Sequence, residues 1–253
     1  MTKQNTTNVG IFGLVEKIIR FIPIIYVFFR YLVKYTNYFE SDFFYLPKIF
    51  KNKKINIIDI GASDGISCKF FLKNLNVNYI FCFEPQKVFH KSLLKICTKI
   101  KRMKFFKYGL GEKNFDDVLY VPYVNFFGKK MFLSTYTFKK RKDLEKQIKL
   151  DFLIKPNIDL IKIKIRKFKI ITKKIDLIKI DTNGSEIFIV KSLKKLIARD
   201  KPVFIIENNN IQEIYKFLKV YNYKKFFVHK NVLKKHSKQT SANIIFKTTD
   251  KKN

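Results

Sequence analysis

From residue 55 onward, short apolar runs that end in a glycine or an acid alternate with segments of helical periodicity. Residues 55–60, 79–83 and 176–181 have the length and the β-branched or aromatic character of buried strands, and a helical segment follows each of them. Strands that alternate with helices in this way predict a mainly parallel sheet covered on both faces. We therefore expect a doubly wound α/β fold.

Weaker signals complete this pattern along the chain. We expect a hairpin that turns near Phe127 and Gly128, between strands at residues 119–124 and 130–135, and a short helix within the charged residues 136–160. The remaining expected elements are helices at residues 64–75, 87–100, 186–197 and 212–220 and strands at residues 104–108, 162–172, 202–207, 226–228 and 243–246. Ligands in such sheets bind beyond the carboxyl ends of the strands, so unusual residues there mark the site.

The chain has 253 residues, which suffices for one sizeable α/β domain and an extension. We expect the extension at residues 1–50 and the main domain at residues 51–253. The extension is apolar from Ile11 to Tyr35, but Arg20 and Arg30 interrupt it and leave it too short to span a membrane. Two interpretations stay open: this helical segment packs on protein, or it lies in a membrane interface.

The formal net charge of +33 raises the question of an anionic partner. Lysine is spread along the whole chain, alanine is scarce and tryptophan is absent, which is typical of the codon bias of an AT-rich genome. The favoured interpretation is that most lysines occupy ordinary solvated faces. A nucleic acid or a membrane surface is the alternative partner.

The loop after the first strand, Asp59-Ile60-Gly61-Ala62-Ser63-Asp64-Gly65, is the strongest functional signal. Gly61 permits a tight turn beside a ligand, and Gly65 opens the following helix without a Cβ. Ser63 and Asp64 stand where a helix cap is expected. Glu84 and Pro85 end the next strand, and the Glu84 carboxylate is placed to accept hydrogen bonds from two ribose hydroxyls.

The composition of this loop separates two classes of nucleotide cofactor. A dinucleotide site has Gly-x-Gly-x-x-Gly and holds a pyrophosphate, whereas this loop has Ser63 and the acid Asp64. S-adenosylmethionine has no phosphate and carries a sulfonium cation, which suits acids at Asp59 and Asp64. We therefore expect S-adenosylmethionine as the cofactor, bound by this loop, by Glu84 and Pro85, and by the turn at Gly109 and Leu110.

A second signal follows the strand at residues 176–181. Asp181 ends this strand, and Glu186 lies about one helical turn further along Asp181-Thr182-Asn183-Gly184-Ser185-Glu186. Asp181 is a candidate to orient a methyl acceptor or to take its proton, and Glu186 is a candidate to assist it. The alternative is that Asp181 and Ser185 cap the following helix and that Glu186 only stabilises its N-terminus.

Together, these motifs resemble the FkbM family of methyltransferases over about residues 54–247. The resemblance rests on the Asp59–Gly65 loop, on Phe83-Glu84-Pro85, and on Ile178-Lys179-Ile180-Asp181 with the segment up to Glu186. It implies a Rossmann-like class I methyltransferase fold, with Asp59, Gly61 and Glu84 in contact with S-adenosylmethionine. The chain departs from the family before Asp176, where the family has a Thr-Leu-Asp and a longer spacer.

The resemblance implies O-methylation of a sugar or another small hydroxyl acceptor in glycan biosynthesis. An RNA methyltransferase that uses the basic surface, and a non-catalytic membrane-surface protein that keeps the fold, are the alternatives. We expect a cytoplasmic protein with peripheral contact to the inner membrane face through the segment from Ile11 to Tyr35. No metal site is expected, because the spacings of the three cysteines and the three histidines do not suit one.

Overall fold

The structure is a computed structural model that describes residues 22–33, 41–169, 171–209, 211–229, 232–235 and 242–248. The described residues fall into two compact units. The first unit takes its described residues from 39–115 and 164–253, and the second takes its residues from 7–38 and 116–163. The predicted boundary after residue 50 does not coincide with this division, and the domain organisation it describes stays a prediction.

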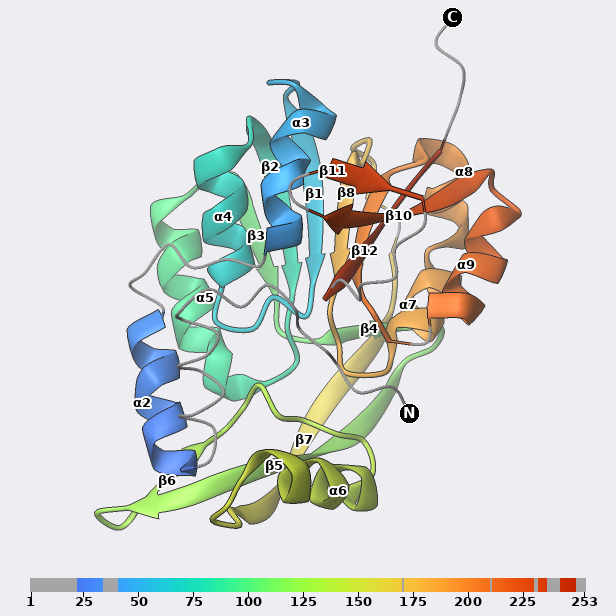
Figure 1. Ribbon diagram of the computed structural model, residues 1–253. Coiled ribbons are helices and arrows are strands. Elements are labelled where there is room, and N and C mark those ends of the chain that lie inside the picture. The colour runs from blue at the N-terminus through green and yellow to red at the C-terminus, as the bar shows by residue number, and fades with distance from the viewer. Residues whose placement is uncertain are drawn as a thin grey trace, which may run out of the picture. The chain divides into compact units, whose positions relative to one another are not determined.

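The first unit is built on an eight-stranded sheet with the order β11-β10-β12-β9-β8-β1-β2-β3 (Figure 1). The strands from β9 to β3 are parallel, and β12 is antiparallel to both of its neighbours. The strand bounds are β1 Ile55–Ile60, β2 Val77–Phe83, β3 Met103–Phe106, β8 Leu177–Ile180, β9 Val203–Glu207, β10 Tyr223–His229, β11 Val232–Lys234 and β12 Asn243–Thr248. The strand order reverses between β1 and β8, which makes this the switch point of the sheet.

Two hydrophobic cores lie on the two faces of this sheet, because successive strand residues point to opposite sides. In β1, Ile58 and Ile60 join one core, while Ile55 and Ile57 join the other. The helices α7 (Glu186–Ser192), α8 (Lys194–Asp200) and α9 (Ile211–Lys219) supply the first core, and α3 (Leu46–Phe50), α4 (Ile66–Asn74) and α5 (Lys87–Lys99) supply the second. The predicted doubly wound fold is confirmed.

Three local predictions need correction. The helix predicted at residues 186–197 is two helices, because Leu193 has ψ near 5° and its N–H is shared between the carbonyls of Ile189 and Val190. The strand predicted at residues 162–172 is β7 (Asn157–Lys167), which ends where Phe168 turns into the core. The short strands β4 (Gly109–Gly111) and β11 were not predicted as strands.

The residues just before β1 belong to the core of the first unit. The 3-10 helix η1 (Ser41–Tyr45) and α3 place Phe43, Leu46 and Phe50 in the same hydrophobic cluster as Ile57 of β1. The buried Asp42 carboxylate accepts a hydrogen bond from the Asn243 N–H at 2.9 Å, and burial raises its pKa. This segment thus packs on the sheet that was predicted to begin after it.

The second unit has a core of its own. It contains α2 (Pro23–Val33), the hairpin of β5 (Phe115–Phe126) and β6 (Lys129–Phe132), the helix α6 (Arg141–Asp151) and most of β7. The strands β4, β7, β5 and β6 form a four-stranded sheet in that order. Tyr26 of α2 is buried in a cluster with Leu133, Leu144, Ile148 and Phe152.

The helix α2 is the described part of the apolar segment from Ile11 to Tyr35. The rest of that segment, apart from Ile22, lies outside the described residues. No helix in the part of the chain that the structure describes has the length and apolar character needed to cross a membrane.

Candidate functional site

The predicted site residues gather at the carboxyl ends of β1, β2 and β8. The strand β1 lies between the other two, and Asp59 is in register with Cys82 of β2 and with Lys179 of β8. Because β1 and β8 flank the switch point, the loops that follow them lie side by side at the edge where ligands bind in this class of sheet. The structure therefore brings the Asp59–Gly65 loop and Asp181 together, as the sequence predicted.

Gly61 lies where these two loops touch. Its φ is +75°, and an added Cβ would lie 1.8 Å from the carbonyl oxygen of Asp181. The Asp181 N–H in turn donates a hydrogen bond to the Ile60 carbonyl oxygen at 3.1 Å. Glycine is thus required here for two reasons, the backbone angle and the close approach of the β8 loop.

We expect Gly61→Ala to lower the free energy of unfolding by about 2 kcal/mol more than Gly184→Ala does. Gly184 is the matched control, since its φ is +102° but nothing lies within 4 Å of an added Cβ. Chemical denaturation of both variants measures the difference. Equal losses would show that the loops separate at no cost, and that the close approach has no structural importance.

The other residues of the loop, from Ala62 to Gly65, have different surroundings. Ser63 adopts a positive φ of +49°, and its Oγ is buried with no hydrogen-bond partner among the described residues. Asp64 is buried and its Oδ1 accepts a hydrogen bond from the Ile66 N–H at 3.4 Å, but the N-cap residue of α4 is Gly65 and no side chain caps this helix, so the cap expected at Ser63 and Asp64 is not formed. Ala62 packs into the core of the first unit, and Gly65, at φ +86°, starts the helix.

Glu84 connects the end of β2 to the first loop. Its Oε2 accepts a hydrogen bond from the Ser63 N–H at 2.9 Å, and its Oε1 accepts one from the Gln86 N–H at 2.9 Å. Only 3% of the residue is exposed, and burial raises the pKa of this carboxyl to about 7. The two backbone donors hold the carboxylate in one orientation and leave each oxygen a second lone pair to accept from a ligand.

Pro85, Gly109 and Leu110 form the packing beside Glu84. An added Cβ at Gly109 would lie 3.4 Å from Pro85 and 2.9 Å from Ile165, so glycine allows β4 to approach both residues. Leu110 is 4% exposed and belongs to the core of the first unit. These contacts give the three residues a packing role, and their predicted contact with a cofactor stays a prediction.

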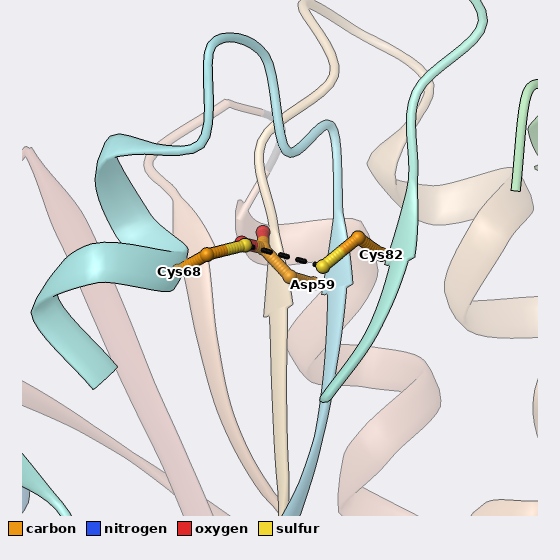
Figure 2. Close-up of side chains that lie close together, drawn as sticks. All are labelled: Asp59, Cys68 and Cys82. Carbon is orange, nitrogen blue, oxygen red and sulfur yellow. Dashed lines mark hydrogen bonds between the residues drawn. The ribbon is translucent and has the colours of Figure 1, made fainter. Parts of the chain in front are cut away.

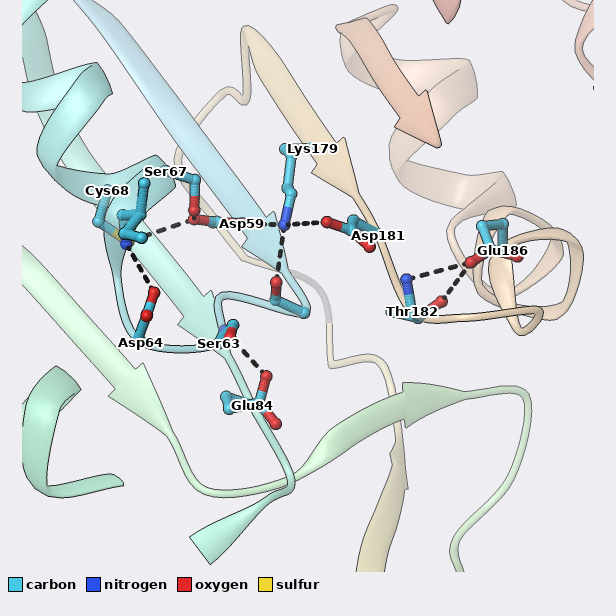
Figure 3. Close-up of polar contacts among 12 residues, drawn as sticks. Asp59, Ser63, Asp64, Ser67, Cys68, Glu84, Lys179, Asp181, Thr182 and Glu186 are labelled. Carbon is cyan, nitrogen blue, oxygen red and sulfur yellow. Dashed lines mark hydrogen bonds and ion pairs between the residues drawn. The ribbon is translucent and has the colours of Figure 1, made fainter. Parts of the chain in front are cut away.

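Lys179 is the residue that connects most of the site (Figure 3). Its ammonium donates a hydrogen bond to the Gly61 carbonyl oxygen at 2.7 Å, and it lies 3.5 Å from Asp59 Oδ1 and 3.3 Å from Asp181 Oδ2. The Lys179 side chain is 6% exposed, and Asp59 is fully buried. One buried cation therefore balances two acids and fixes the carbonyl of the glycine turn.

Asp181 and Glu186, the two predicted catalytic acids, have different surroundings. The Asp181 side chain keeps 43% of its surface exposed, so it is accessible to a ligand. Glu186 is 1% exposed, and its Oε1 accepts hydrogen bonds from the Thr182 N–H, the Thr182 hydroxyl and the Gly184 N–H at 3.0–3.1 Å (Figure 3). The geometry gives Glu186 the role of organising the loop that follows Asp181.

Residues 59–225 of the sequence match the Methyltransferase FkbM domain. The chain belongs to the FkbM methyltransferase family. The match begins at Asp59 and ends within β10, so it includes every residue of the site described above. No curated protein sequence matches the chain.

Solved structures place this FkbM-family chain among class I methyltransferase folds. The crystal structure of methyltransferase FkbM from Methylobacillus flagellatus KT aligns with a TM-score of 0.51 at 14% identity, over 92% of this chain and 57% of that one. The chain thus spans a little over half the length of that protein. Lower similarity is found to the tRNA methyltransferase TrmK of B. subtilis (TM-score 0.44, 10% identity, 85% and 68% coverage) and to precorrin-6y C5,15-methyltransferase of Geobacter metallireducens GS-15 (0.40, 10%, 81% and 86%).

The FkbM-family site also contains a buried cysteine pair that the sequence did not indicate. Cys68 Sγ lies 3.1 Å from Cys82 Sγ and 3.2 Å from Asp59 Oδ2, and the three residues come from α4, β2 and β1 (Figure 2). Both residues are fully buried. The contact cannot be predicted from the spacing of 14 positions, because it forms only when α4 packs against the sheet.

The chemistry of this trio favours hydrogen-bonded packing over a metal site. Its three candidate ligand atoms lie within 4.8 Å of one another. However, a metal needs thiolates, whereas the mutual hydrogen bond and burial raise the pKa of the Cys68 thiol, and burial raises that of the Cys82 thiol. Asp59 already accepts from Ser67 Oγ at 2.5 Å and pairs with the Lys179 cation.

Proposed function

We propose that this chain is an S-adenosylmethionine-dependent methyltransferase that binds its donor beyond the carboxyl ends of β1 and β2. The observation that carries the proposal is the buried Glu84 carboxylate, held against the glycine loop by the Ser63 N–H. A carboxylate fixed in this way is suited to accept hydrogen bonds from both ribose hydroxyls of a nucleoside. S-adenosylmethionine supplies a methyl group on a sulfonium, which is activated for transfer to a nucleophile.

The residues present fit this group. Ser63 Oγ and Asp59 Oδ1 are buried without a hydrogen-bond partner among the described residues, although the Lys179 cation lies 3.5 Å from Asp59 Oδ1. Unsatisfied buried oxygens beside the loop are suited to donors from a ligand. The left-handed angles at Gly61, Ser63 and Gly65 shape this turn, and Gly61 lets it lie directly against the Asp181 carbonyl at the proposed donor site.

Glu84→Ala is expected to weaken S-adenosylmethionine binding by about 30-fold, or about 2 kcal/mol, because two charge-assisted hydrogen bonds are lost. Calorimetry on the purified chain measures the dissociation constant, and thermal unfolding checks that the variant is folded. A folded Glu84→Ala variant with unchanged affinity would remove Glu84 from the cofactor site. Tight NADH binding by the unmodified chain would contradict the proposed cofactor.

We also expect the binding of S-adenosylmethionine to depend on pH, because Glu84 titrates near neutral pH. Since the pKa of Glu84 is about 7, the carboxylate predominates above pH 7 and the neutral acid predominates below it. The ionised form is the better acceptor for two hydroxyls, so affinity should fall by roughly tenfold from pH 8 to pH 6. In Glu84→Gln, which does not titrate, this pH dependence should disappear; if it persists, another group causes it.

We further propose that the acceptor is a hydroxyl of a sugar or of another small molecule in glycan biosynthesis. Asp181 supports this proposal, because a half-exposed carboxylate beside the donor loop can accept a hydrogen bond from a hydroxyl and orient it. RNA methylation is the second candidate, and the net charge of +33 favours it. Retention on an RNA column that falls steeply with salt, together with methyl transfer to RNA, would select this second candidate.

A further inference from the structure

The tip of the β5–β6 hairpin carries an exposed aromatic residue in an unfavourable conformation. Phe126 pairs with Lys129, so the connection consists of two residues, Phe127 and Gly128. Both have positive φ, +44° and +72°, as in the type I′ turns of tight hairpins. Phe127 is 88% exposed, the largest fraction among the exposed large apolar residues that the structure describes.

Stability alone does not account for phenylalanine at this position. The first residue of a type I′ turn favours asparagine, aspartate or glycine, since other side chains are strained at positive φ. An exposed ring at the tip gains no burial within the chain that offsets this strain. A residue that is unfavourable both in backbone conformation and in solvation is better explained by contact with something outside the chain.

The exposed aromatic surface continues from the tip onto α2, in the same compact unit. The ring of Phe126 lies 4.6 Å from the ring of Phe127 and 5.5 Å from that of Phe28. Phe28 is 45% exposed, and Ile25, one turn earlier on the helix, is 43% exposed. Tyr26 of α2 is buried, whereas Ile25 and Phe28 stay partly exposed, so among the described side chains of this helix apolar residues lie both in the core and at the surface.

The positive charge of the chain favours an anionic membrane as the partner that binds this surface. We propose that the aromatic tip, defined as Ile25, Phe28, Phe126 and Phe127, docks into the interface of an anionic lipid membrane. The exposed Lys129 follows the turn directly, so a cation lies beside the aromatic rings. When the rings enter the membrane interface, this cation can bind the anionic lipid headgroups. A second copy of the chain would bring a further net charge of +33 to the contact, whereas an anionic surface attracts that charge.

This inference adds a second element to the expected membrane contact of the segment from Ile11 to Tyr35, and it does not depend on the proposed chemistry. The hairpin lies about a hundred positions further along the sequence, and the ring contact between Phe28 and Phe126 joins the two elements. No helix among the described residues is long and apolar enough to cross a membrane, and the proposed contact of the two elements is interfacial, with aromatic rings and a cation beside them.

Phe127→Asn tests the inference without threatening the fold, because asparagine is favoured at this turn position. The unmodified full chain should float with vesicles of phosphatidylglycerol at low salt and not with vesicles of phosphatidylcholine. Phe127→Asn should reduce its partition into phosphatidylglycerol vesicles by about tenfold, since one aromatic side chain no longer enters the interface. Val220→Asn is the matched control, because Val220 is 79% exposed in the other unit.

A second measurement locates the tip directly. The chain contains no tryptophan, so Phe127→Trp introduces a single fluorophore at the tip, and Val220→Trp introduces one elsewhere. Phosphatidylglycerol vesicles should shift the emission of Phe127→Trp to shorter wavelength, brominated lipids should quench it, and Val220→Trp should show neither change. Emission from Phe127→Trp that vesicles leave unchanged would overturn the inference. A shift that follows protein concentration without lipid would also overturn it, because the tip would then be a contact between copies of the chain.

Discussion

Lys179→Met is expected to lower the free energy of unfolding by about 3–5 kcal/mol, which is typical of breaking a buried ion pair. The variant leaves the Asp59 carboxylate buried with no cation, and it removes the hydrogen bond from Lys179 to the Gly61 carbonyl oxygen. Methionine has a similar length and an apolar side chain, so the loss comes from charge and hydrogen bonding more than from volume. Urea unfolding followed by circular dichroism measures the effect.

Two further variants test whether this loss of stability comes from breaking the buried ion pair of Lys179 and Asp59. Asp59→Asn in the Lys179→Met background should recover at least about 2 kcal/mol, because the double variant has no uncompensated buried charge. Lys53→Met is the control for an exposed lysine, since Lys53 is 57% exposed and pairs with Asp176 at 2.8 Å. It should cost no more than about 1 kcal/mol. If Lys179→Met costs no more than this control, the buried cation does not hold the site together.

The fold could be predicted from the sequence because its central strands are buried on both faces. A continuous apolar run such as residues 79–83 predicts a buried strand at any position within a parallel sheet. The glycine loop was equally accessible, since Gly61 and Gly65 have the positive φ that the motif requires. The end of α7 could not be predicted in this way, because Leu193 ends the helix without glycine or proline.

The role of Lys179 could not be inferred in the same way. In the sequence it is a lysine within a buried strand, which signals an unusual environment but not the identity of its partners. The partners Asp59 and Gly61 precede it by more than a hundred positions, and only the pairing of β1 with β8 places them beside it. The contact of Cys68 with Cys82 was hidden for the same reason.

Glu186 shows how the structure separates two roles that the sequence left open. Asp181 and Glu186 both stand near the end of β8, and each was a candidate either for catalysis or for a structural role at the start of the following helix. Three donors from Thr182 and Gly184 converge on one oxygen of Glu186, whereas Asp181 is half-exposed beside Lys179. Local sequence cannot reveal this difference, since it depends on how the loop between the two acids folds.

Asp181→Asn is expected to lower turnover by roughly 100-fold or more while S-adenosylmethionine binding changes by less than about twofold. Asparagine keeps the size of the side chain, but it loses the charge that orients a hydroxyl or takes its proton. Lys179 supports the proposed role, because its ammonium lies 3.3 Å from Asp181 Oδ2 and holds that carboxylate beside the glycine loop. The measurement is the rate of S-adenosylhomocysteine formation with an acceptor found among sugar hydroxyl compounds, and calorimetry reports donor binding.

Glu186→Gln is the matched comparison for this prediction. The glutamine carbonyl oxygen can accept the same hydrogen bonds from Thr182 and Gly184, so turnover should fall by no more than a few-fold. If Glu186→Gln loses as much turnover as Asp181→Asn, the two acids act together and Glu186 takes part in the chemistry. If Asp181→Asn retains full turnover, the half-exposed carboxylate is structural, and the acceptor must be activated by the donor site alone.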